Sequence, residues 1–194
     1  MRNEPMRYDP LPILVVGDPR LEQVAAEVSP DDAVLPHEIG QMHATLDAFR
    51  RNHGFGRAIA APQVGIRKRL IAMNLGIEPL ALVNPEIIWR SDELFEVWDD
   101  CLSIPDRIVR VRRHKCISFR YRDEHWREKI CERISTDLSE LLQHEIDHLD
   151  GILMLARAWG ADAIRPIAEH ATLIIANRPK RQSSLAPFER ATES

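Results

Sequence analysis

The chain of 194 residues is 44% hydrophobic and 29% charged, a composition that supports one globular domain and argues against disorder along its whole length. Its formal net charge of −4 argues against a nucleic-acid partner, which would favour a basic face. The sequence has no apolar run long enough for a membrane span and no apolar core of a secretory signal, and its three cysteines make no disulfide framework. We therefore expect a cytoplasmic protein that binds neither membranes nor nucleic acid.

In the N-terminal half, short strands are predicted around one helix. The β-branched run over 13–16, which a Gly-Asp-Pro turn follows, predicts a strand. Apolar residues recur at helical spacing over 38–53, and Gly54 supplies a left-handed stop, so we predict a helix there. Residues 54–65 form a loop rich in glycine and alanine. Further short strands are predicted over 69–74, 81–89 and 107–112.

Residues 115–121 and 126–134 predict a β-hairpin centred on Asp123-Glu124. A two-residue turn at that point would place Cys116 opposite Cys131. Because disulfides are rare in cytosolic proteins, we expect these two thiols to stay unpaired.

The strongest helix signal of the sequence lies between Thr136 and Gly151. Thr136 or Asp137 fits the N-cap, apolar residues recur at helical spacing, and Gly151 ends the segment. A last helix is predicted over 161–177, bent or restarted at Pro166. We predict a single domain over 1–178 and a polar, disordered tail over 179–194.

The helix that begins at Thr136 contains the run His144-Glu145-Ile146-Asp147-His148. Residues four apart lie one helical turn above each other, so both imidazoles can bind one metal ion. Glu145 beside them can accept a proton from a bound water, while Asp147 is expected to position the helix by hydrogen bonding. The alternative is a surface helix with two unrelated histidines, which a capped, amphipathic helix disfavours.

A catalytic metal site needs a third protein ligand and one open position. The pentapeptide leaves that ligand open. Downstream, Glu169 and His170 are candidates, although no recognisable motif surrounds them. Upstream, Cys101 stands in a strand-like region flanked by acidic residues, where a lone cytosolic cysteine is more often a small buried apolar residue.

Three segments in fixed order resemble the peptide deformylase family. They are GRAIAAPQVG over 56–65, DDCLS over 99–103 and QHEIDHL over 143–149, against the family's G-x-G-h-A-A-x-Q (h apolar), E-G-C-L-S and Q-H-E-x-D-H. Weaker similarity extends over 12–155. The resemblance implies an α+β fold in which small antiparallel β-sheets pack around a central HExxH helix, with an N-terminal helix and a C-terminal helix.

The resemblance also implies a metal centre. Cys101, His144 and His148 would hold one divalent ion, Fe²⁺ in the first place, with Zn²⁺ or Ni²⁺ as substitutes. A soft thiolate and borderline imidazoles suit these metals.

The catalytic roles implied by the resemblance fall on three residues. Glu145 would move a proton from the bound water to the leaving amine. The Gln63 side-chain amide and the Leu102 backbone N–H would hold the formyl oxygen as it becomes negative. The substrate would be N-formyl-Met of nascent polypeptides, which the protein would meet on the ribosome.

Departures from the family cluster around the expected pocket for the methionine side chain. The Glu-Gly before the family's cysteine is Asp-Asp here, the apolar residue after its first glycine is arginine, and its second glycine is alanine. The helical period also places Glu140 and Leu141 one turn before His144, on the side of the expected pocket. The predicted substrate-binding residues are Gly56, Arg57, Ala58, Asp99, Asp100, Glu140 and Leu141.

Three interpretations of these charges are open. Arg57 could point to solvent while Glu140 pairs locally. The charges could instead suit a more polar formylated peptide or a small formylated metabolite, since an unpaired charge beside an apolar group is costly. Arg57 and Glu140 could also pair across the pocket and narrow it. The competing class of function is a catalytically weak, metal-binding homologue, and a zinc peptidase would leave Cys101 and Gln63 unexplained.

Overall fold

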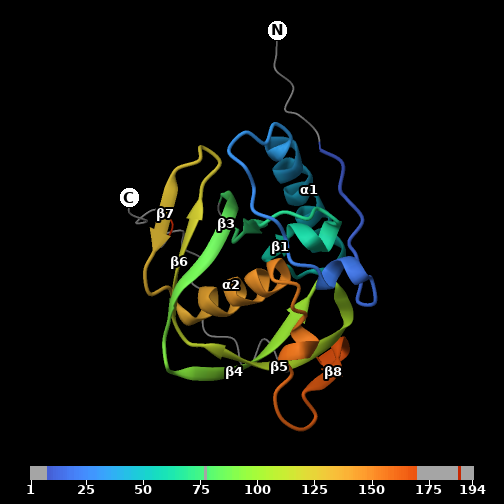
Figure 1. The fold of residues 1–194 in the computed structure, drawn as a ribbon. Coiled ribbons are helices and arrows are strands. Elements are labelled where there is room, and N and C mark those ends of the chain that lie inside the picture. The colour runs from blue at the N-terminus through green and yellow to red at the C-terminus, as the bar shows by residue number, and fades with distance from the viewer. Residues whose placement is uncertain (1–7, 77, 170–187, 189–194) are drawn as a thin grey trace.

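The computed structural model describes residues 8–76, 78–169 and 188, and this part of the chain forms an α+β fold (Figure 1). Its two α-helices are α1 (Leu35–His53) and α2 (Thr136–Leu149). One antiparallel sheet has five strands in the order β1-β2-β3-β6-β7, and the other has three in the order β4-β5-β8. The strands are β1 (Ala58–Ala60), β2 (Leu70–Asn74), β3 (Pro79–Arg90), β4 (Leu94–Cys101), β5 (Ile104–His114), β6 (Ile117–Arg122), β7 (Glu128–Cys131) and β8 (Ile164–Pro166).

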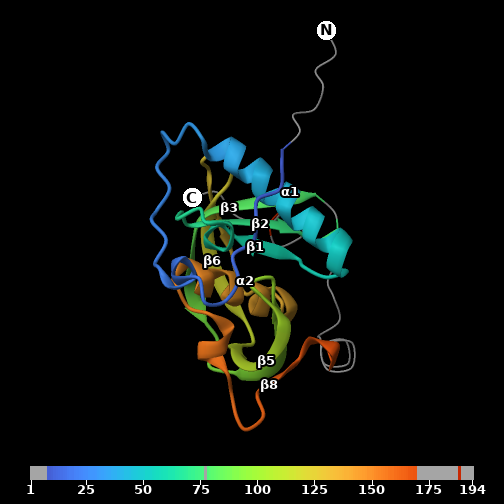
Figure 2. The same ribbon diagram turned by 90° about the vertical axis from the view of Figure 1, so that its right-hand side faces the viewer.

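Strands β1, β2 and β3 lie between the two α-helices (Figure 2). Successive side chains of a strand point to opposite faces of its sheet. In β2, Leu70 and Ala72 accordingly pack with α1 residues in one core, and Ile71 and Met73 pack with α2 residues in another. Both faces are covered, which explains why β2 reads as an almost continuous apolar run.

Helix α1 covers one face of the five-stranded sheet with a stripe of buried side chains that includes Ile39, Met42 and Leu46. The predicted helix over 38–53 is confirmed and begins three residues earlier, at Leu35. Gly54 ends it with φ of 77°, in the left-handed region that glycine adopts without steric cost.

Helix α2 is buried from Asp137 to Leu149, polar residues included. Thr136 and Asp137 are its first helical residues, so they are not the cap; the N-cap position is held by Ser135. Gly151 follows the helix with φ of 71°, as predicted, and a Cβ there would lie 2.7 Å from the carbonyl oxygen of Glu22. This glycine therefore allows the chain segment before α1 to pass close to the end of α2.

Strands β4 and β5 form a hairpin whose tip carries Cys101. The pairing shifts from Asp100 opposite Ile108 to Cys101 opposite Ile104, which marks a β-bulge. Bulges re-aim side chains and occur often beside active sites. Leu102 and Ser103 form the turn, so the D-D-C-L-S segment is the closed end of a β-hairpin.

The predicted 115–134 hairpin is confirmed as β6 and β7, but the register differs from the predicted one. Cys131 pairs with Phe119 and not with Cys116, because the loop over 123–127 is longer than a two-residue turn. Among the described residues, no disulfide joins Cys116 and Cys131.

Other local predictions were wrong. Residues 13–16 form no strand; the segment is extended, and its Leu14 and Val16 N–H groups donate to the carbonyls of Gln63 and Ser103. Part of the predicted 54–65 loop is strand β1. Residues 161–169 contain β8 instead of a helix, since Ile164 pairs with Val109 of β5.

The rest of the predicted C-terminal helix, over 170–177, lies outside the described residues. In the predicted tail, the described Phe188 packs against Phe119 and Tyr121; the disorder predicted for its other residues stays a prediction. None of the helices among the described residues has the length and apolar character needed to cross a membrane.

Candidate metal centre

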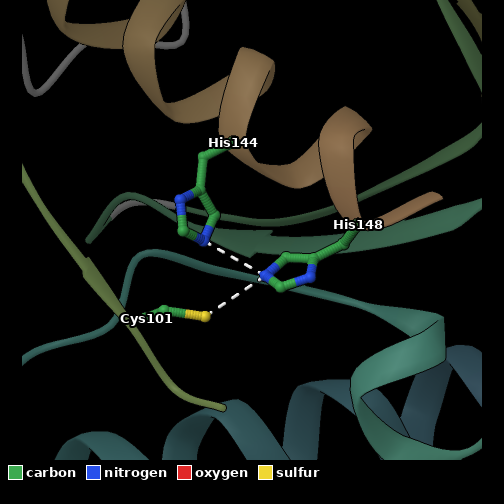
Figure 3. Close-up of side chains that lie close together, drawn as sticks. All are labelled: Cys101, His144 and His148. Atoms are coloured by element: carbon green, nitrogen blue, oxygen red, sulfur yellow. Dashed lines mark hydrogen bonds between the residues drawn. The ribbon is translucent and has the colours of Figure 1, made fainter. Parts of the chain in front are cut away.

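Helix α2 and the β4–β5 hairpin bring Cys101, His144 and His148 together. Figure 3 shows the three side chains pointing toward one another, the two imidazoles from consecutive turns of α2 and the thiol from the hairpin tip. The His148 Nε2 atom lies 3.2 Å from the Cys101 Sγ and 3.2 Å from the His144 Nε2. All three side chains are buried.

These distances suit three ligands of one small cation. Bond lengths of about 2.0–2.3 Å in tetrahedral geometry separate ligand atoms by roughly 3.3–3.6 Å, close to the spacing found here. Two further buried atoms, Glu145 Oε2 and His148 Nδ1, have no hydrogen-bond partner among the described residues. Burial of a carboxylate oxygen without a hydrogen-bond partner costs free energy. We therefore expect a further polar group to bind at this site.

The downstream alternative for the third ligand does not join this group. Among the described residues, the cluster consists of Cys101 and the two helix histidines, and Glu169 is not part of it. His170 lies outside the described residues. The donor set of one thiolate and two imidazoles is the one that divalent iron or zinc accepts.

Asp99 was predicted to line the substrate pocket, and its carboxylate also contacts His144, a candidate metal ligand. Its Oδ2 atom accepts a hydrogen bond of 2.8 Å from the His144 Nδ1 and one of 3.1 Å from Arg113. A proton on Nδ1 leaves the Nε2 lone pair free for a metal. Asp99 therefore fixes the tautomer and orientation of the His144 imidazole.

Arg113 links Asp99 to a second carboxylate on the helix. Its guanidinium pairs with both Asp99 and Asp147, and Asp147 also accepts from Arg157 at 2.6 Å. The Arg113 side chain is only 4% exposed. The expectation that Asp147 positions the helix without serving as a ligand agrees with these contacts. Arg113 was missed, because nothing near it in the sequence marks it as part of the site.

The protonation of the buried carboxyls follows from these surroundings. Burial alone would raise the pKa of Asp99, but the charges and hydrogen bonds of His144 and Arg113 hold it below its ordinary value. Burial raises the pKa of Glu145 to about 7, which is close to neutral pH, where a general acid and base is most effective. A bound cation would lower that pKa by attraction.

Gln63 approaches the same centre from the 3₁₀ turn Ala61–Val64. Its Oε1 accepts from the Ala60 N–H at 2.9 Å, which turns the amide nitrogen toward the hairpin tip. That nitrogen lies 3.2 Å from the Ser103 Oγ and 3.6 Å from the Cys101 Sγ. The side chain is 1% exposed. Gln63 thus places its amide N–H groups beside Cys101, a candidate metal ligand.

All seven predicted substrate-binding residues line a single small cavity. Leu102, His144 and Glu145 line the same cavity, so it opens directly onto the candidate centre. The predicted substrate-binding residues that line this cavity are Gly56, Arg57, Ala58, Asp99, Asp100, Glu140 and Leu141.

Arg57 does not point to solvent, and the interpretation that it does is wrong. Its guanidinium pairs with Glu140 and, at 3.0 Å, with Asp137. Its side chain is 11% exposed. The observed arrangement is the pairing across the cavity. Asp137 was not among the predicted pocket residues, although helix phase places it a turn before Glu140 and Leu141.

Comparison with known proteins agrees with this geometry. Residues 10–162 match the family model described as polypeptide deformylase. The chain belongs to the polypeptide deformylase family. Its members are metal-dependent hydrolases, so the protein is an enzyme of that class.

Among curated deformylases, the peptide deformylase of Heliobacterium modesticaldum is 40% identical over 146 residues, which cover 75% of this chain and 91% of the relative. That of Thermotoga neapolitana is 36% identical over 145 residues, covering 75% and 85%. The crystal structure of the Thermotoga maritima deformylase has a TM-score of 0.71 at 33% identity, covering 79% of this chain and all of that chain. The Synechococcus elongatus deformylase in complex with actinonin has a TM-score of 0.72 at 32% identity, covering 92% and 96%.

Proposed function

We propose that the protein hydrolyses the formyl amide at the N-terminus of formylated polypeptides, releasing formate and a free amine. The observation that carries this proposal is the convergence of three groups in a chain of the polypeptide deformylase family. They are a buried Cys-His-His set, an unpartnered Glu145 oxygen and the Gln63 amide, and His144 and Glu145 line a cavity beside them. Nascent chains, which begin with formyl-methionine in bacteria, are the default source of such substrates.

Cys101, His144 and His148 would hold one divalent ion, and we propose Fe²⁺, with Zn²⁺ or Ni²⁺ as substitutes. When bound, such an ion lowers the pKa of water toward neutrality and polarises a carbonyl. The chain supplies a thiolate and two imidazoles, and Asp99 sets the tautomer of one of them.

Glu145 is the proposed proton carrier. It would accept a proton from the water whose oxygen attacks the formyl carbon and deliver it to the amine as the carbon–nitrogen bond breaks. Burial raises the pKa of this carboxyl to about 7 in the metal-free chain, and a bound cation would lower it from there, so the carboxylate is available to accept a proton at neutral pH. The low exposure of the side chain, 3%, keeps bulk water from competing for that proton.

Gln63 and Leu102 are the proposed donors to the formyl oxygen. Negative charge develops on this oxygen during attack, and a preorganised N–H lowers the barrier. The Ala60 N–H already orients the Gln63 amide, whose N–H groups donate to Ser103 Oγ and Cys101 Sγ and would exchange one of these bonds for the formyl oxygen. Leu102 follows Cys101 in the hairpin turn, which places its backbone next to a ligand.

The direct test is formate release by protein that carries one equivalent of metal. Chain loaded with Fe²⁺ without oxygen is incubated with N-formyl dipeptides of varied first residue, and both formate and free amine are quantified. Metal-stripped protein is the control. Hydrolysis should yield equal amounts of the two products, only after loading. A fully loaded, folded protein that released formate from none of the dipeptides would contradict the proposal.

A further inference from the structure

The cavity beside the metal ligands has a volume of about 20 Å³. One water molecule needs a cavity of about 10–15 Å³. This cavity therefore accepts little more than one water molecule. His144, Glu145 and Leu102 line it. In the proposed function a formyl amide is held at these residues, so this cavity is a space beside it that a substituent next to its nitrogen could occupy.

The wall of the cavity is an ion-paired cluster. Arg57, which immediately precedes β1, reaches across to two carboxylates on α2, Asp137 and Glu140. The exposed fractions of the three side chains are 11%, 6% and 4%, so water hardly reaches the pairs. We call these three residues the charged latch.

The latch presents charge where an apolar side chain would need apolar atoms. Its one cation faces two carboxylates, and Asp100 in the same lining adds to the negative field at Arg57. Burial by itself would lower the pKa of Arg57, but Glu140 and Asp137 raise it, so the guanidinium stays charged. Apolar atoms gain little against such a wall, because they cannot replace the hydrogen bonds of the ions they would displace.

The latch is also hard to move aside. Withdrawal of the Arg57 side chain would leave two buried carboxylates without their cation, and breaking a buried pair in this way is strongly unfavourable. Arg57 makes a further backbone contact, since its carbonyl accepts from the Asn74 N–H at 2.9 Å. The side chain therefore extends from a backbone that is already fixed to strand β2.

We propose that the charged latch closes this cavity to large apolar side chains, so that the enzyme acts on formyl amides with a small side chain, or none, next to the formylated nitrogen. The inference rests on the proposed function for the reaction, and it replaces formyl-methionine, the default substrate there, with formyl amides whose side chain is small or absent. It makes Arg57, Asp137 and Glu140 specificity-determining residues that take no part in the chemistry.

A pair of unreactive ligands tests the inference without turnover. Two peptide hydroxamates that chelate the bound metal identically are compared, one with an n-butyl side chain at the position next to the chelating group and one with hydrogen there. Their Kd values for metal-loaded wild-type protein should be similar. In an open apolar pocket a single methylene is worth about 10–200-fold, so tighter binding of the n-butyl ligand by tenfold or more would overturn the inference.

A variant with the latch replaced by apolar residues gives the second arm. The triple substitution Arg57→Ile, Asp137→Leu and Glu140→Leu removes all three charges together, and such replacement of buried ions is often tolerated. In this variant the n-butyl ligand should gain at least about tenfold over its partner. A folded, metal-loaded variant that showed no such gain would also refute the inference.

The chain offers a matched control for the triple substitution. Lys68 pairs with Asp32 and Glu38, again one cation with two carboxylates, and none of the three lines the cavity. The substitutions Lys68→Met, Asp32→Leu and Glu38→Leu change the charge equally and should leave the ligand preference of the wild type unchanged. If the preference for the n-butyl ligand rose as much in this control as in the latch variant, the cause would be a general electrostatic effect and not the latch.

Activity separates this inference from the proposed function. Wild-type protein should cleave formyl-Gly-Ala at least as well as formyl-Met-Ala, as judged by kcat/KM, and the latch variant should reverse that order. Loaded protein that cleaved neither peptide, yet bound the two hydroxamates as expected, would refute the proposed function and support the closed cavity. The comparison of the two hydroxamates on wild-type protein needs no substitution. It can therefore still refute the inference if the variant fails to fold.

Discussion

Replacement of Asp99 tests the contacts that hold His144, a candidate metal ligand, in place. The Oδ2 atom of Asp99 accepts from the His144 Nδ1 at 2.8 Å and from Arg113 at 3.1 Å, with 6% of the side chain exposed. In Asp99→Asn the amide oxygen can still accept from both donors, but the negative charge is lost. In Asp99→Ala the acceptor is lost as well.

Loss of a group that orients a metal-bound histidine lowers metal affinity by about 10–100-fold. We expect the loss of metal affinity to lie near the lower end of that range for Asp99→Asn and near the upper end for Asp99→Ala. At about 1.4 kcal/mol per tenfold change, these losses correspond to about 1.4 and about 2.8 kcal/mol of metal-binding free energy. Without metal, both variants should unfold more easily than the wild type, because Arg113 loses one of its two buried carboxylates.

The assay is competition for Zn²⁺ with a chelator of known affinity, combined with denaturant unfolding of the metal-free protein. Asp18→Asn is the matched control, since Asp18 also pairs with an arginine, Arg20, but on the surface. It should leave metal affinity unchanged. If Asp99→Ala bound metal as tightly as the wild type, while folded, Asp99 would have no part in orienting the ligand.

Three further predictions follow from single residues. Cys101→Ser should lose or greatly weaken metal binding, since a hydroxyl is a harder and poorly ionised ligand; stoichiometric metal at wild-type affinity, measured by elemental analysis after dialysis, would disprove this ligand. Gln63→Ala should keep its metal but raise the barrier by about 2.7–4 kcal/mol, and an unchanged kcat would exclude an oxyanion role. Gly151→Ala should destabilise the fold by more than the about 1–2 kcal/mol of the left-handed conformation alone, because the added Cβ meets the Glu22 carbonyl. Gly54→Ala, with a φ of 77° and open space around it, is the control in denaturant unfolding; equal losses would rule out the contact.

The helices were predictable because their signals are local. The apolar residues of α1 and α2 recur with the helical period, and each helix is followed by a glycine in the left-handed conformation, Gly54 or Gly151. The His144 and His148 pair followed from the same period. In these segments the tertiary structure buries the face that the sequence pattern already defines.

Extended segments were harder to predict, because a strand depends on a partner elsewhere in the chain. Residues 13–16 have a strand-like composition, yet their N–H groups bond to two loops instead of to a strand. Residues 164–166 were assigned to a helix, but pairing with β5 makes them a strand. Local preference cannot distinguish these outcomes, since the deciding hydrogen bonds join distant segments.

The electrostatic part of the site was only partly predictable for the same reason. Helix phase placed Glu140 beside the cavity, but its pairing partner Arg57 lies 83 residues earlier. The contact between Asp99 and His144 spans 45 residues. Similarity of motifs placed Asp99 in the lining of the pocket, where it lies, but gave no sign that its carboxylate also contacts His144.

The central claim is that a metal held by Cys101, His144 and His148 works together with Glu145 in hydrolysis. The most direct measurement is formate release from an N-formyl dipeptide by wild-type protein and Glu145→Ala, each titrated with divalent metal. Activity of the wild type should rise to a plateau at one metal per chain. Glu145→Ala should bind the same equivalent with kcat lower by about 10²–10⁴. Full activity in metal-free protein, or a wild-type rate in metal-loaded Glu145→Ala, would contradict the account.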